Sequence, residues 1–389
     1  MSMRILHIVG DSKYGGGSYI ILRLAQMARV AGWEPWVLTT DPVFQQVLAE
    51  NALSYTDCTL IPREIRPYKD LRALQQLTAY LRANRFDIVH THTSKGGFIG
   101  RRAAWRAGVP AIIHTVHGFA FHEQSPPAQV RLYAAIERIA ARWCHKIVTV
   151  SRYHRDWALA LKIAPPSKIV AIPNGLDPAR VEPTQPPDAV RRALDIRAGV
   201  PIILSTGRLA VQKGFEYLIE SAAMLKHRIA QPFQVIIAGE GPLKDALQRQ
   251  IQHLGVCDSV RLIGFYKTIG DLYALADLVV LPSLWEGLSI ALLEAMAAGK
   301  PIITTTIGSN LEATDNGRIA PLVPPKDAPA LANAIQHLLG DPQRAAHYAH
   351  AARAHFMQHY TETRMLEQYR QLYCEVLDAA GCNPRRSSK

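Results

Sequence analysis

The chain has 389 residues, of which 48% are hydrophobic, and its formal net charge is +12 at pH 7. Its mean hydropathy of -0.01 is typical of a globular protein, and no apolar run reaches the ~18–20 residues of a membrane-spanning helix. This length predicts about two domains. Scattered cysteines without a Cys-x-x-Cys pair argue against a disulfide framework or a zinc site, and favour a reducing cytosol. They are Cys58, Cys144, Cys257, Cys374 and Cys382.

The first residues pass directly into the apolar run Arg4–Val9, so we expect no signal peptide and a cytoplasmic location. Nearly all of the excess positive charge lies in residues 1–180. A basic half suits nucleic acid, an anionic lipid surface or a phosphorylated substrate, or it is simply a solvated surface. No helix-turn-helix, zinc-finger or RRM sequence occurs, so nucleic acid is not an expected partner.

Strand-like apolar runs alternate with helical stretches along the whole chain, which is typical of parallel α/β sheets. The expected strands of the first half are Arg4–Val9, Glu34–Thr39, Asp87–His92, Ala111–Thr115, Lys146–Val150 and Lys168–Ile172. Those of the second half are Pro201–Thr206, Gln234–Ala238, Val260–Ile263, Leu278–Leu281 and Pro301–Thr305. The pattern predicts two Rossmann-like halves with a cleft between them.

A proline-rich stretch without periodicity, residues 177–187, interrupts this pattern and is interpreted as an interdomain linker. Residues from about Arg344 to Ala380 are helical in pattern, and the polar end Asn383–Lys389 is expected to be frayed. We therefore expect a first domain over residues 1–179 and a second over 180–358. Residues 359–389 would form a helix that crosses back to the first domain, followed by a polar tail.

A glycine loop, Gly15 to Gly17, follows the first strand and leads into a helix. Glycines let a backbone approach a phosphate closely, and a helix N-terminus adds exposed N–H groups. The dinucleotide spacing Gly-x-Gly-x-x-Gly is absent, which argues against a nicotinamide enzyme. Taken alone, the loop is as consistent with a flexible turn as with a phosphate-binding site.

The second half opens with a strand followed by Gly207, Arg208, Lys213 and Gly214. An arginine binds phosphate oxygens bidentately and a lysine supplies a mobile point charge, so the pair suits a diphosphate. As isolated residues, Arg208 and Lys213 would more often be solvated loop charges. Because no Asp-x-Asp sequence occurs, we expect no metal to neutralise that diphosphate.

Two glutamates eight positions apart, Glu286 and Glu294, follow the buried run Leu278–Leu281. If Glu286 precedes the first turn of the next helix and Glu294 lies on it, both can point into one cleft at the carboxyl end of a strand. A carboxylate is a good acceptor for vicinal hydroxyls. Taken alone, the spacing more often means two surface glutamates.

His117, beside Gly118, follows the strand Ala111–Thr115 at the expected carboxyl edge of the first sheet. Imidazole suits proton transfer or the orientation of a reacting oxygen near neutral pH. A single histidine is more often structural, and that is our interpretation of His114 within the strand. The position of His117 at the ligand-binding edge favours a functional role.

Residues 127–144 predict an amphipathic helix. Its apolar residues fall on one face: Leu132, Ile136, Ile139 and Trp143. Its basic residues line an adjacent stripe: Arg131, Arg138 and Arg142. Such a helix suits an anionic membrane surface, or it packs in the core with a solvated arginine edge, and both interpretations remain open. Arg101 and Arg102 provide a second candidate membrane contact.

Together, these motifs resemble those of the GT-B glycosyltransferases of family 4, a group of retaining nucleotide-sugar enzymes. The matching pieces occur in family order over about residues 5–320: Gly16-Gly17, His117-Gly118, Val150-Ser151, Pro173-Asn174-Gly175, Gly207-Arg208, Lys213-Gly214, Ala238-Gly239-Glu240-Gly241-Pro242, and Glu286 with Glu294. Residues 92–98 and 114–123 resemble bacterial enzymes that build lipid-linked O-antigen, capsule or exopolysaccharide repeats.

The resemblance implies a GT-B fold, with two Rossmann-like domains facing each other across a cleft and a nucleotide sugar, UDP-linked, bound by the second. Glu294 would bind the ribose hydroxyls, and Arg208 and Lys213 the diphosphate. Glu286 would contact the donor sugar, with His117 near it. The remaining implied donor contacts are Gly16, Gly17, Glu240, Leu288, Ser289 and Ile290.

The resemblance also implies transfer of a hexosyl or N-acetylhexosaminyl group with retention of anomeric configuration and without a metal cofactor. The implied acceptor is a lipid-linked or other saccharide at the inner face of the cytoplasmic membrane, which fits the basic first half. The family often has a turn with two glycines where this chain has Gly308-Ser309-Asn310-Leu311-Glu312. Because the second glycine is missing, the donor contacts of that turn are not carried over.

Three alternatives remain beside this one, and the last of them is a nucleic-acid-binding module. The first is a soluble transferase that makes a small glycoside or a sugar phosphate. The second is a catalytically silent nucleotide-sugar-binding protein that keeps the fold. A silent copy need not keep His117, Arg208, Lys213, Glu286 and Glu294 together, and this argues against it.

Overall fold

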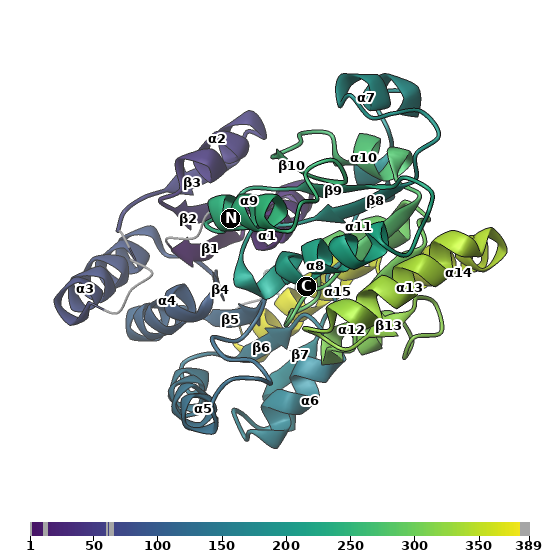
Figure 1. The fold of residues 1–389 in the computed structure, drawn as a ribbon. Helices are drawn as coiled ribbons and strands as arrows, with labels where there is room; N and C mark the ends of the chain where they lie inside the picture. Colours follow the sequence, from purple (N-terminus) through teal and green to yellow (C-terminus); the bar gives the residue numbers. More distant parts are fainter. Residues whose placement is uncertain (1, 11–14, 60, 62–65, 382–389) are drawn as a thin grey trace. The chain divides into compact units, whose positions relative to one another are not determined.

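The computed structural model describes residues 2–10, 15–59, 61 and 66–381. The chain divides into two compact units: Met1–Asn174 with the segment from Thr363 onward, and Gly175–Glu362. Each unit contains one parallel sheet with helices (Figure 1). The predicted fold class, α/β with two Rossmann-like halves, is confirmed. The expected polar tail and Cys382 lie outside the described residues.

The first unit is built on a seven-stranded sheet in the order β3-β2-β1-β4-β5-β6-β7. All of its strand pairs are parallel. Its strands are β1 (Arg4–Gly10), β2 (Glu34–Thr39), β3 (Ser54–Thr56), β4 (Ile88–His92), β5 (Ala111–Val116), β6 (Lys146–Thr149) and β7 (Ile169–Ala171). The strand order reverses between β1 and β4, and open α/β sheets bind ligands outside the carboxyl ends of strands at such a point.

Seven α-helices and one 3₁₀ helix of the described residues accompany this sheet. They are α1 (Gly16–Val30), α2 (Pro42–Glu50), α3 (Pro67–Asn84), α4 (Ser94–Ala107), α5 (Pro127–Ala141), α6 (Arg152–Ala160), η1 (Pro166–Lys168) and α15 (Glu362–Ala379). Helix α15 comes from the far end of the chain. Its Tyr373 hydroxyl lies 2.7 Å from Nδ1 of His90 in β4. Its Tyr369 hydroxyl lies 3.0 Å from Oγ1 of Thr115 in β5, so α15 is an integral part of this unit.

Helix α4 approaches the sheet closely because its first turns carry glycine. A Cβ atom built on Gly97 would lie 2.3 Å from Cε1 of His114, and one on Gly100 would lie 2.7 Å from Cγ2 of Thr91. Both separations are far shorter than a van der Waals contact. Gly97 and Gly100 are therefore required by packing against β5 and β4, respectively.

The second unit is built on a six-stranded parallel sheet in the order β10-β9-β8-β11-β12-β13. Its strands are β8 (Ile202–Thr206), β9 (Gln234–Ala238), β10 (Val260–Gly264), β11 (Leu278–Leu281), β12 (Ile302–Thr305) and β13 (Leu322–Val323). The order reverses between β8 and β11, which repeats the arrangement of β1 and β4. The ligand-binding position predicted by this topology lies at the carboxyl ends of β8 and β11.

The helices of the second unit cover a core in which Ile203, Val235, Leu218 and Ile335 are fully buried. They are η2 (Pro178–Val181), α7 (Pro187–Ala193), η3 (Val211–Lys213), α8 (Phe215–Lys226), α9 (Lys244–His253), α10 (Ile269–Leu275), α11 (Ile290–Ala297), α12 (Gly308–Ala313), α13 (Ala328–Gly340) and α14 (Pro342–His359). Helices α8 and α13 contribute Leu218 and Ile335 to this core.

Every strand expected from the sequence is present, with its ends shifted by one residue at most. Two strands were not expected, β3 with three residues and β13 with two. Both are too short to show a recognisable apolar run. Strand β3 is also largely exposed, so its sequence lacks the hydrophobic signal of the others.

The proline-rich segment that the sequence suggested as a linker is instead a structured part of the second unit. It contains the 3₁₀ helix η2, and Val181 is buried. The backbone N–H groups of Thr184 and Gln185 donate to Oδ1 of Asp271 in α10 at 2.6 and 3.1 Å. Proline rigidity and these bonds order the segment without any periodic pattern. The division between the units falls earlier, between Asn174 and Gly175.

Candidate active site

The loops that follow β8 and β9 are held together by glycines in conformations that other residues rarely adopt. Gly207 has φ 148° and Gly239 has φ 150°. A Cβ atom on Gly239 would lie 1.8 Å from the carbonyl oxygen of Gly207. A Cβ atom on Gly214, with φ 63°, would lie 2.2 Å from the carbonyl oxygen of Pro282 after β11. These glycines let the loops after β8, β9 and β11 pack directly against one another.

The loop after β8 and the loop after β11 meet in an ion pair between Lys213 and Glu286. The Glu286 carboxylate also accepts hydrogen bonds from Gln212 Nε2 and Ser283 Oγ, both at 2.9 Å. Both charged side chains are largely buried, with 18% of Lys213 and 8% of Glu286 exposed. A compact polar cluster therefore occupies the carboxyl ends of β8 and β11, where the topology predicts a ligand.

Glu294, the second glutamate of the predicted pair, lies in α11 and is 6% exposed. Its Oε1 accepts a hydrogen bond from Nε of Arg180 at 2.8 Å, and its Oε2 accepts one from the Tyr273 hydroxyl at 3.2 Å. Thr206, at the end of β8, lies 3.1 Å from the same hydroxyl. The two predicted glutamates are thus anchored by different partners, Glu286 by Lys213 and Glu294 by Tyr273.

The electrostatics of this edge are set by burial. Burial raises the pKa of Glu294 above its ordinary value, and the Arg180 guanidinium, the Tyr273 hydroxyl and the Lys213 ammonium group oppose that rise. Burial also raises the pKa of Tyr273 well above its ordinary value, and the neighbouring Glu294 carboxylate adds to the effect. Tyr273 therefore remains a protonated hydrogen-bond donor toward Glu294.

The remaining predicted donor residues lie on the same loops. Arg208 is exposed, and its guanidinium has no ion pair or hydrogen bond within the described part of the chain. Glu240, which follows Gly239, is half exposed and forms an ion pair with Lys244 at 3.2 Å. Ser289 is the N-cap of α11 and accepts a bond from the Leu292 N–H at 3.4 Å. Leu288 and Ile290 flank it at the start of that helix.

The segment in which this chain departs from the family pattern forms the short helix α12. The Ser309 hydroxyl donates to the backbone carbonyl oxygen of Glu286 at 3.2 Å. Nδ2 of Asn310 donates to Oγ1 of Thr304 and to the carbonyl oxygen of Thr305, at 2.8 and 3.2 Å. Although the second glycine is missing, this turn therefore supports the backbone of the Glu286 loop.

In the first unit, His117 lies beside the glycine loop that follows β1. A Cβ atom on Gly17 would lie 3.7 Å from Cγ of the His117 ring, so the loop and the ring are neighbours. Gly16 begins α1, with Gly15 as its N-cap. Nε2 of His117 lies 3.1 Å from Nδ1 of His92. Burial lowers the pKa of His117 to about 4, so its imidazole is neutral at pH 7.

The structure corrects one predicted membrane contact. Arg101 is fully buried between α4 and α5, where its Nη2 forms an ion pair with Oε2 of Glu137 at 2.8 Å and its Nε donates to the Gly97 carbonyl oxygen at 2.9 Å. It cannot reach a membrane surface. The helical pattern did not reveal this, because the partner carboxylate belongs to another helix. Arg102 is half-buried and lies over the rings of Trp105 and Trp143, 4.7 Å from each centroid.

Helix α5 buries only part of the apolar face that its pattern suggested, since Ile136 and Trp143 are half-buried. Leu132 and Ile139 are 60% and 44% exposed. The side chains that face inward are instead Ala134, Glu137, Ala140 and Ala141. The three predicted arginines, Arg131, Arg138 and Arg142, are exposed. Trp105 of α4 is 53% exposed. Among the described helices, none combines the length and apolarity needed to cross a membrane.

Arg180, Gln212 and Tyr273 are among the residues of the second-unit cluster that were not foreseen. Arg180 lies in the proline-rich segment and contacts a residue 114 positions away, so no local pattern marks it. Gln212 adjoins the predicted Lys213, and that adjacency is the only available signal. Tyr273 lies on the short helix α10. In the sequence, a buried aromatic residue on such a helix cannot be distinguished from an ordinary core residue.

Comparison with known proteins identifies the family. Residues 15–175 match the family model "Glycosyl transferase 4-like domain", and residues 188–355 match "Glycosyl transferases group 1". The chain is 32% identical over 282 residues to an Escherichia coli protein, UDP-Gal:alpha-D-GlcNAc-diphosphoundecaprenol alpha-1,3-galactosyltransferase, with 72% of this chain and 73% of that protein covered. It is 28% identical over 356 residues to the putative glycosyltransferase EpsD of Bacillus subtilis, with 89% and 90% covered.

Solved structures agree on the fold. The structure of Anabaena Alr3699/HepE in complex with UDP-glucose is similar with a TM-score of 0.82 at 23% identity, covering 97% of this chain and 100% of that one. WaaG, a glycosyltransferase involved in lipopolysaccharide biosynthesis, is similar with a TM-score of 0.73 at 18% identity, covering 95% and 99%. The chain therefore belongs to the GT-B glycosyltransferases of family 4 and is an enzyme of that class.

Proposed function

We propose that the protein is a retaining glycosyltransferase that moves a sugar from a UDP-sugar to a hydroxyl group of a lipid-linked saccharide during cell-surface polysaccharide synthesis. The observation that carries this proposal is the cluster of Lys213, Glu286 and Glu294 at the carboxyl ends of β8 and β11. The name of the E. coli relative specifies a UDP-galactose donor and a diphosphoundecaprenol acceptor. The HepE complexes contain UDP and UDP-glucose. Both support a UDP-linked donor.

In this proposal Glu294 binds the ribose hydroxyls, because its buried carboxylate is already held in one orientation by Arg180 and Tyr273. Arg208 and Lys213 bind the diphosphate. The Arg208 guanidinium is exposed and available, and Lys213 is held in place by Glu286. Glu286 also contacts the donor sugar, and the N–H groups at the start of α11 add donors for its phosphate or hydroxyl oxygens.

Transfer proceeds on one face of the sugar. The bond between the anomeric carbon and the diphosphate oxygen breaks, and its electron pair remains on that oxygen. The acceptor hydroxyl forms the new bond on the same face, and its proton passes to the leaving diphosphate. The protein's contribution is positioning, together with stabilisation of the negative charge that develops on the diphosphate. Arg208 and Lys213 supply this charge stabilisation in place of a metal ion, and the sequence contains no Asp-x-Asp pair.

The acceptor side of the proposal depends on the exposed surface of α5. We call this surface the α5 patch, made of Arg131, Leu132, Arg138, Ile139 and Arg142. Apolar side chains next to arginines suit the boundary between headgroups and acyl chains of an anionic membrane. The patch would hold the enzyme at the cytoplasmic membrane, where a lipid-linked saccharide is available.

The donor site is tested by measuring thermal stability with a panel of nucleotides and nucleotide sugars in the presence of EDTA. A ligand that binds only the folded state stabilises it by about 2.7 kcal/mol at 100 times its dissociation constant. We expect stabilisation by UDP and by one UDP-sugar, with the effect lost in Arg208→Ala and kept in Arg228→Ala, an exposed arginine of the same unit. No stabilisation by any nucleotide would remove the donor assignment. Stabilisation only with added metal would remove the metal-free mechanism.

The acceptor proposal is tested by sedimentation with vesicles containing anionic lipid and by activity on paired acceptors. We expect the wild-type chain to sediment and to prefer a diphosphate-lipid acceptor over the same saccharide without lipid. Leu132→Glu with Ile139→Glu should abolish sedimentation, while Val211→Glu, a change at an exposed apolar residue of the second unit, should not. Equal activity on both acceptors without vesicle binding would instead support a soluble transferase.

A further inference from the structure

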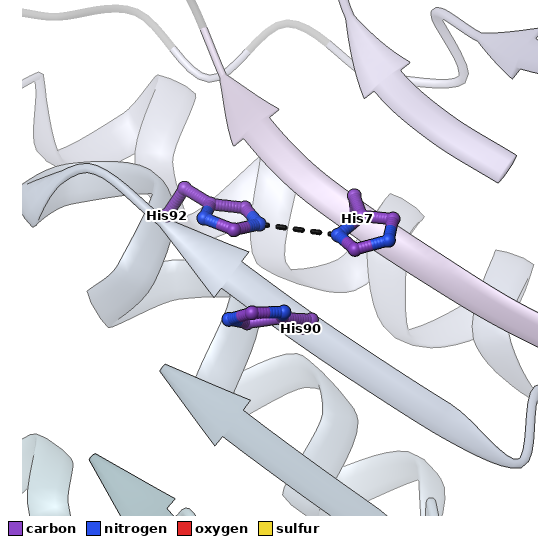
Figure 2. A group of neighbouring side chains, drawn as sticks. All are labelled: His7, His90 and His92. Atoms are coloured by element: carbon purple, nitrogen blue, oxygen red, sulfur yellow. Dashed lines mark hydrogen bonds between the residues drawn. The ribbon is translucent and has the colours of Figure 1, made fainter. Parts of the chain in front are cut away.

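Three histidines lie together on one face of the first sheet: His7 from β1, and His90 and His92 from β4 (Figure 2). Strand pairing places His7 opposite His90. His90 and His92 are two positions apart on one strand and therefore share a face. All three are fully buried. Buried imidazoles need hydrogen-bond partners, since burying a polar group without one is costly.

Two of these rings form a chain with His117. Nδ1 of His7 lies 3.2 Å from Nε2 of His92, the contact drawn as a dashed line in Figure 2. Nδ1 of His92 lies 3.1 Å from Nε2 of His117. The ring centroids are 5.5 and 5.2 Å apart, and the ring planes differ by 24° and 27°. Each centroid separation exceeds the nitrogen–nitrogen distance by about two ring radii, so the rings meet edge to edge, as a hydrogen bond requires.

His90 does not belong to this chain, and its bonds argue against a metal centre in the cluster. Its Nδ1 lies 2.7 Å from the Tyr373 hydroxyl and its Nε2 lies 2.7 Å from Oγ1 of Thr115. A zinc ion needs lone pairs from at least three protein ligands. Because both nitrogens of His90 are hydrogen-bonded, His90 has no free lone pair for a metal ion shared with His7 and His92. The imidazole chain is therefore the feature of this cluster that calls for a function.

The chain couples the protonation of its three members. A neutral imidazole has one N–H and one bare nitrogen, so His92 cannot donate to both neighbours. If its Nδ1–H donates to His117, its Nε2 must accept from Nδ1–H of His7. If its Nε2–H donates to His7, its Nδ1 must accept from Nε2–H of His117. The three rings therefore carry the same tautomer, either Nδ1–H throughout or Nε2–H throughout.

The two ends of the chain decide between these forms. Nε2 of His7 is buried and has no hydrogen-bond partner within the described ranges. One end of the chain must carry an N–H and the other a bare nitrogen. His7 is fully buried, so an N–H there could not reach a substrate, whereas His117 is partly exposed, which favours the bare nitrogen on His7 and the N–H on His117. Nδ1 of His117 likewise lacks a partner among the residues that the structure describes, and it would lie 3.9 Å from a Cβ on Gly17, in the first turn of α1. Backbone N–H groups at a helix N-terminus bind ligands that are rich in oxygen atoms. An N–H on Nδ1 of His117 would add one more donor beside them.

We propose that His7 and His92 are positioning residues that hold His117 as the neutral Nδ1–H tautomer, with that N–H directed at an oxygen atom of the bound substrate. The inference rests on the proposed function, in which the bound substrates are a nucleotide sugar and an acceptor that carries a hydroxyl group. In this form His117 orients a substrate oxygen and takes up no proton. That agrees with a reaction in which the acceptor's proton passes to the leaving diphosphate.

The tautomers are measured directly by two-bond ¹⁵N–¹H correlation NMR of the full chain labelled with ¹⁵N-histidine at pH 7. His7→Phe and His92→Phe identify the resonances, with His7→Asn as the substitute if a phenylalanine variant does not fold. We expect Nδ1–H tautomers for His7, His92 and His117 in the wild-type chain. A mixed set, or Nε2–H throughout, overturns the proposal. Stoichiometric Zn²⁺ that shifts His7, His90 and His92 together would also overturn it, in favour of a metal centre.

Kinetics supply the second test. His92→Phe should lower kcat roughly tenfold, the loss of about one hydrogen bond in the transition state, and leave KM for the nucleotide sugar unchanged. His92→Asn should retain most of the activity, because its amide N–H can replace Nδ1–H as donor to His117. Equal losses in both variants would mean that His92 is merely structural. UDP stabilisation of the wild-type chain is measured alongside: its absence removes the proposed function, whereas the NMR spectra still report the tautomers.

Discussion

Tyr273 donates a hydrogen bond from its hydroxyl to Oε2 of Glu294 at 3.2 Å, although the two residues lie on different helices, α10 and α11. The same hydroxyl is within hydrogen-bonding distance of Thr206 at the end of β8 and of the Ala291 carbonyl oxygen, both at 3.1 Å. Tyr273 thus joins the end of a central strand to the carboxylate of Glu294, which we propose binds the ribose. The orientation of that carboxylate depends on a residue that contributes no charge.

Replacing Tyr273 by phenylalanine should destabilise the second unit and weaken UDP binding. Glu294 is buried, so losing a hydrogen bond to its carboxylate should cost about 1.5–3 kcal/mol. Urea unfolding and calorimetric titration with UDP measure the two effects. Tyr348→Phe, on α14 in the same unit, is the matched control and should change neither. Wild-type affinity in Tyr273→Phe would show that Glu294 does not need this bond to bind the nucleotide.

Gly239→Ala should unfold the second unit or destabilise it by several kcal/mol. A Cβ at this position would lie 1.8 Å from the Gly207 carbonyl oxygen, and φ of 150° is strained for any other residue. Gly255→Ala separates the two causes, because φ there is also positive, 64°, but nothing lies within 4 Å of the new Cβ. That control should lose only about 1 kcal/mol. Thermal melts of both variants measure the loss of stability. Equal losses would mean that the strain of a positive φ, and not the clash with Gly207, accounts for the effect.

Removing one charge of the buried pair Arg101–Glu137 should destabilise the protein more than removing both charges. Glu137→Gln leaves the arginine buried without its counter-charge and should cost about 3–5 kcal/mol. The double variant Arg101→Met with Glu137→Leu should recover most of that loss, since it removes both charges. Chemical unfolding of the single and double variants gives the coupling energy. The exposed pair Arg370–Glu367, at 2.7 Å, should give a much smaller coupling energy in the same measurement, because solvent screens its charges.

The first unit should lose stability as the pH falls from 6.5 toward 5. Burial lowers the pKa of His7 to about 3 and of His117 to about 4. Burial also lowers the pKa values of His90, His92 and His114 well below the ordinary value. In this pH range these histidines bind protons in the unfolded chain but stay neutral in the folded unit. The free energy of unfolding therefore decreases as the pH falls. Each such histidine contributes up to about 1.4 kcal/mol per pH unit.

Urea unfolding at pH 7, 6 and 5 measures this slope by tryptophan fluorescence, because most of the tryptophans lie in the first unit. His7→Phe should reduce the slope by the share of one histidine, whereas His350→Gln at an exposed position should leave it unchanged. A stability independent of pH between 7 and 5 would show that these imidazoles take up protons freely in the folded state.

The strands and the main site loops could be predicted because their signals are local. An apolar run identifies a buried strand, and glycines next to a strand end identify a tight loop. Glu286 and Glu294 were singled out by their spacing after β11 together with the motifs around them. Arg180 was not, because it depends on a contact across 114 positions from a segment without periodicity. The same is true of Arg101, whose burial depends on Glu137 of another helix.

The surface of α5 shows a different limit. Its pattern allowed both a core-facing helix and a membrane-facing one, since amphipathicity does not say what covers the apolar side. The structure leaves Leu132 and Ile139 exposed because small alanines, together with Glu137, make the inward contacts. Similarly, His7 lies within an ordinary strand sequence. Its role in the imidazole chain depends on the pairing of β1 with β4, which no local pattern specifies.

The placement of α15 has a consequence for how the protein is made. The first unit begins at the start of the chain, yet Tyr369 and Tyr373 of α15 hydrogen-bond to Thr115 and His90 in the interior of its sheet. The ribosome must therefore synthesise the whole second unit, a continuous segment from Gly175 to Glu362, before the first can be completed. During translation the second unit can fold on its own, while the sheet of the first unit lacks α15 and His90 lacks its contact with Tyr373. Aggregation of nascent chains halted before α15 is the characteristic failure expected of this topology.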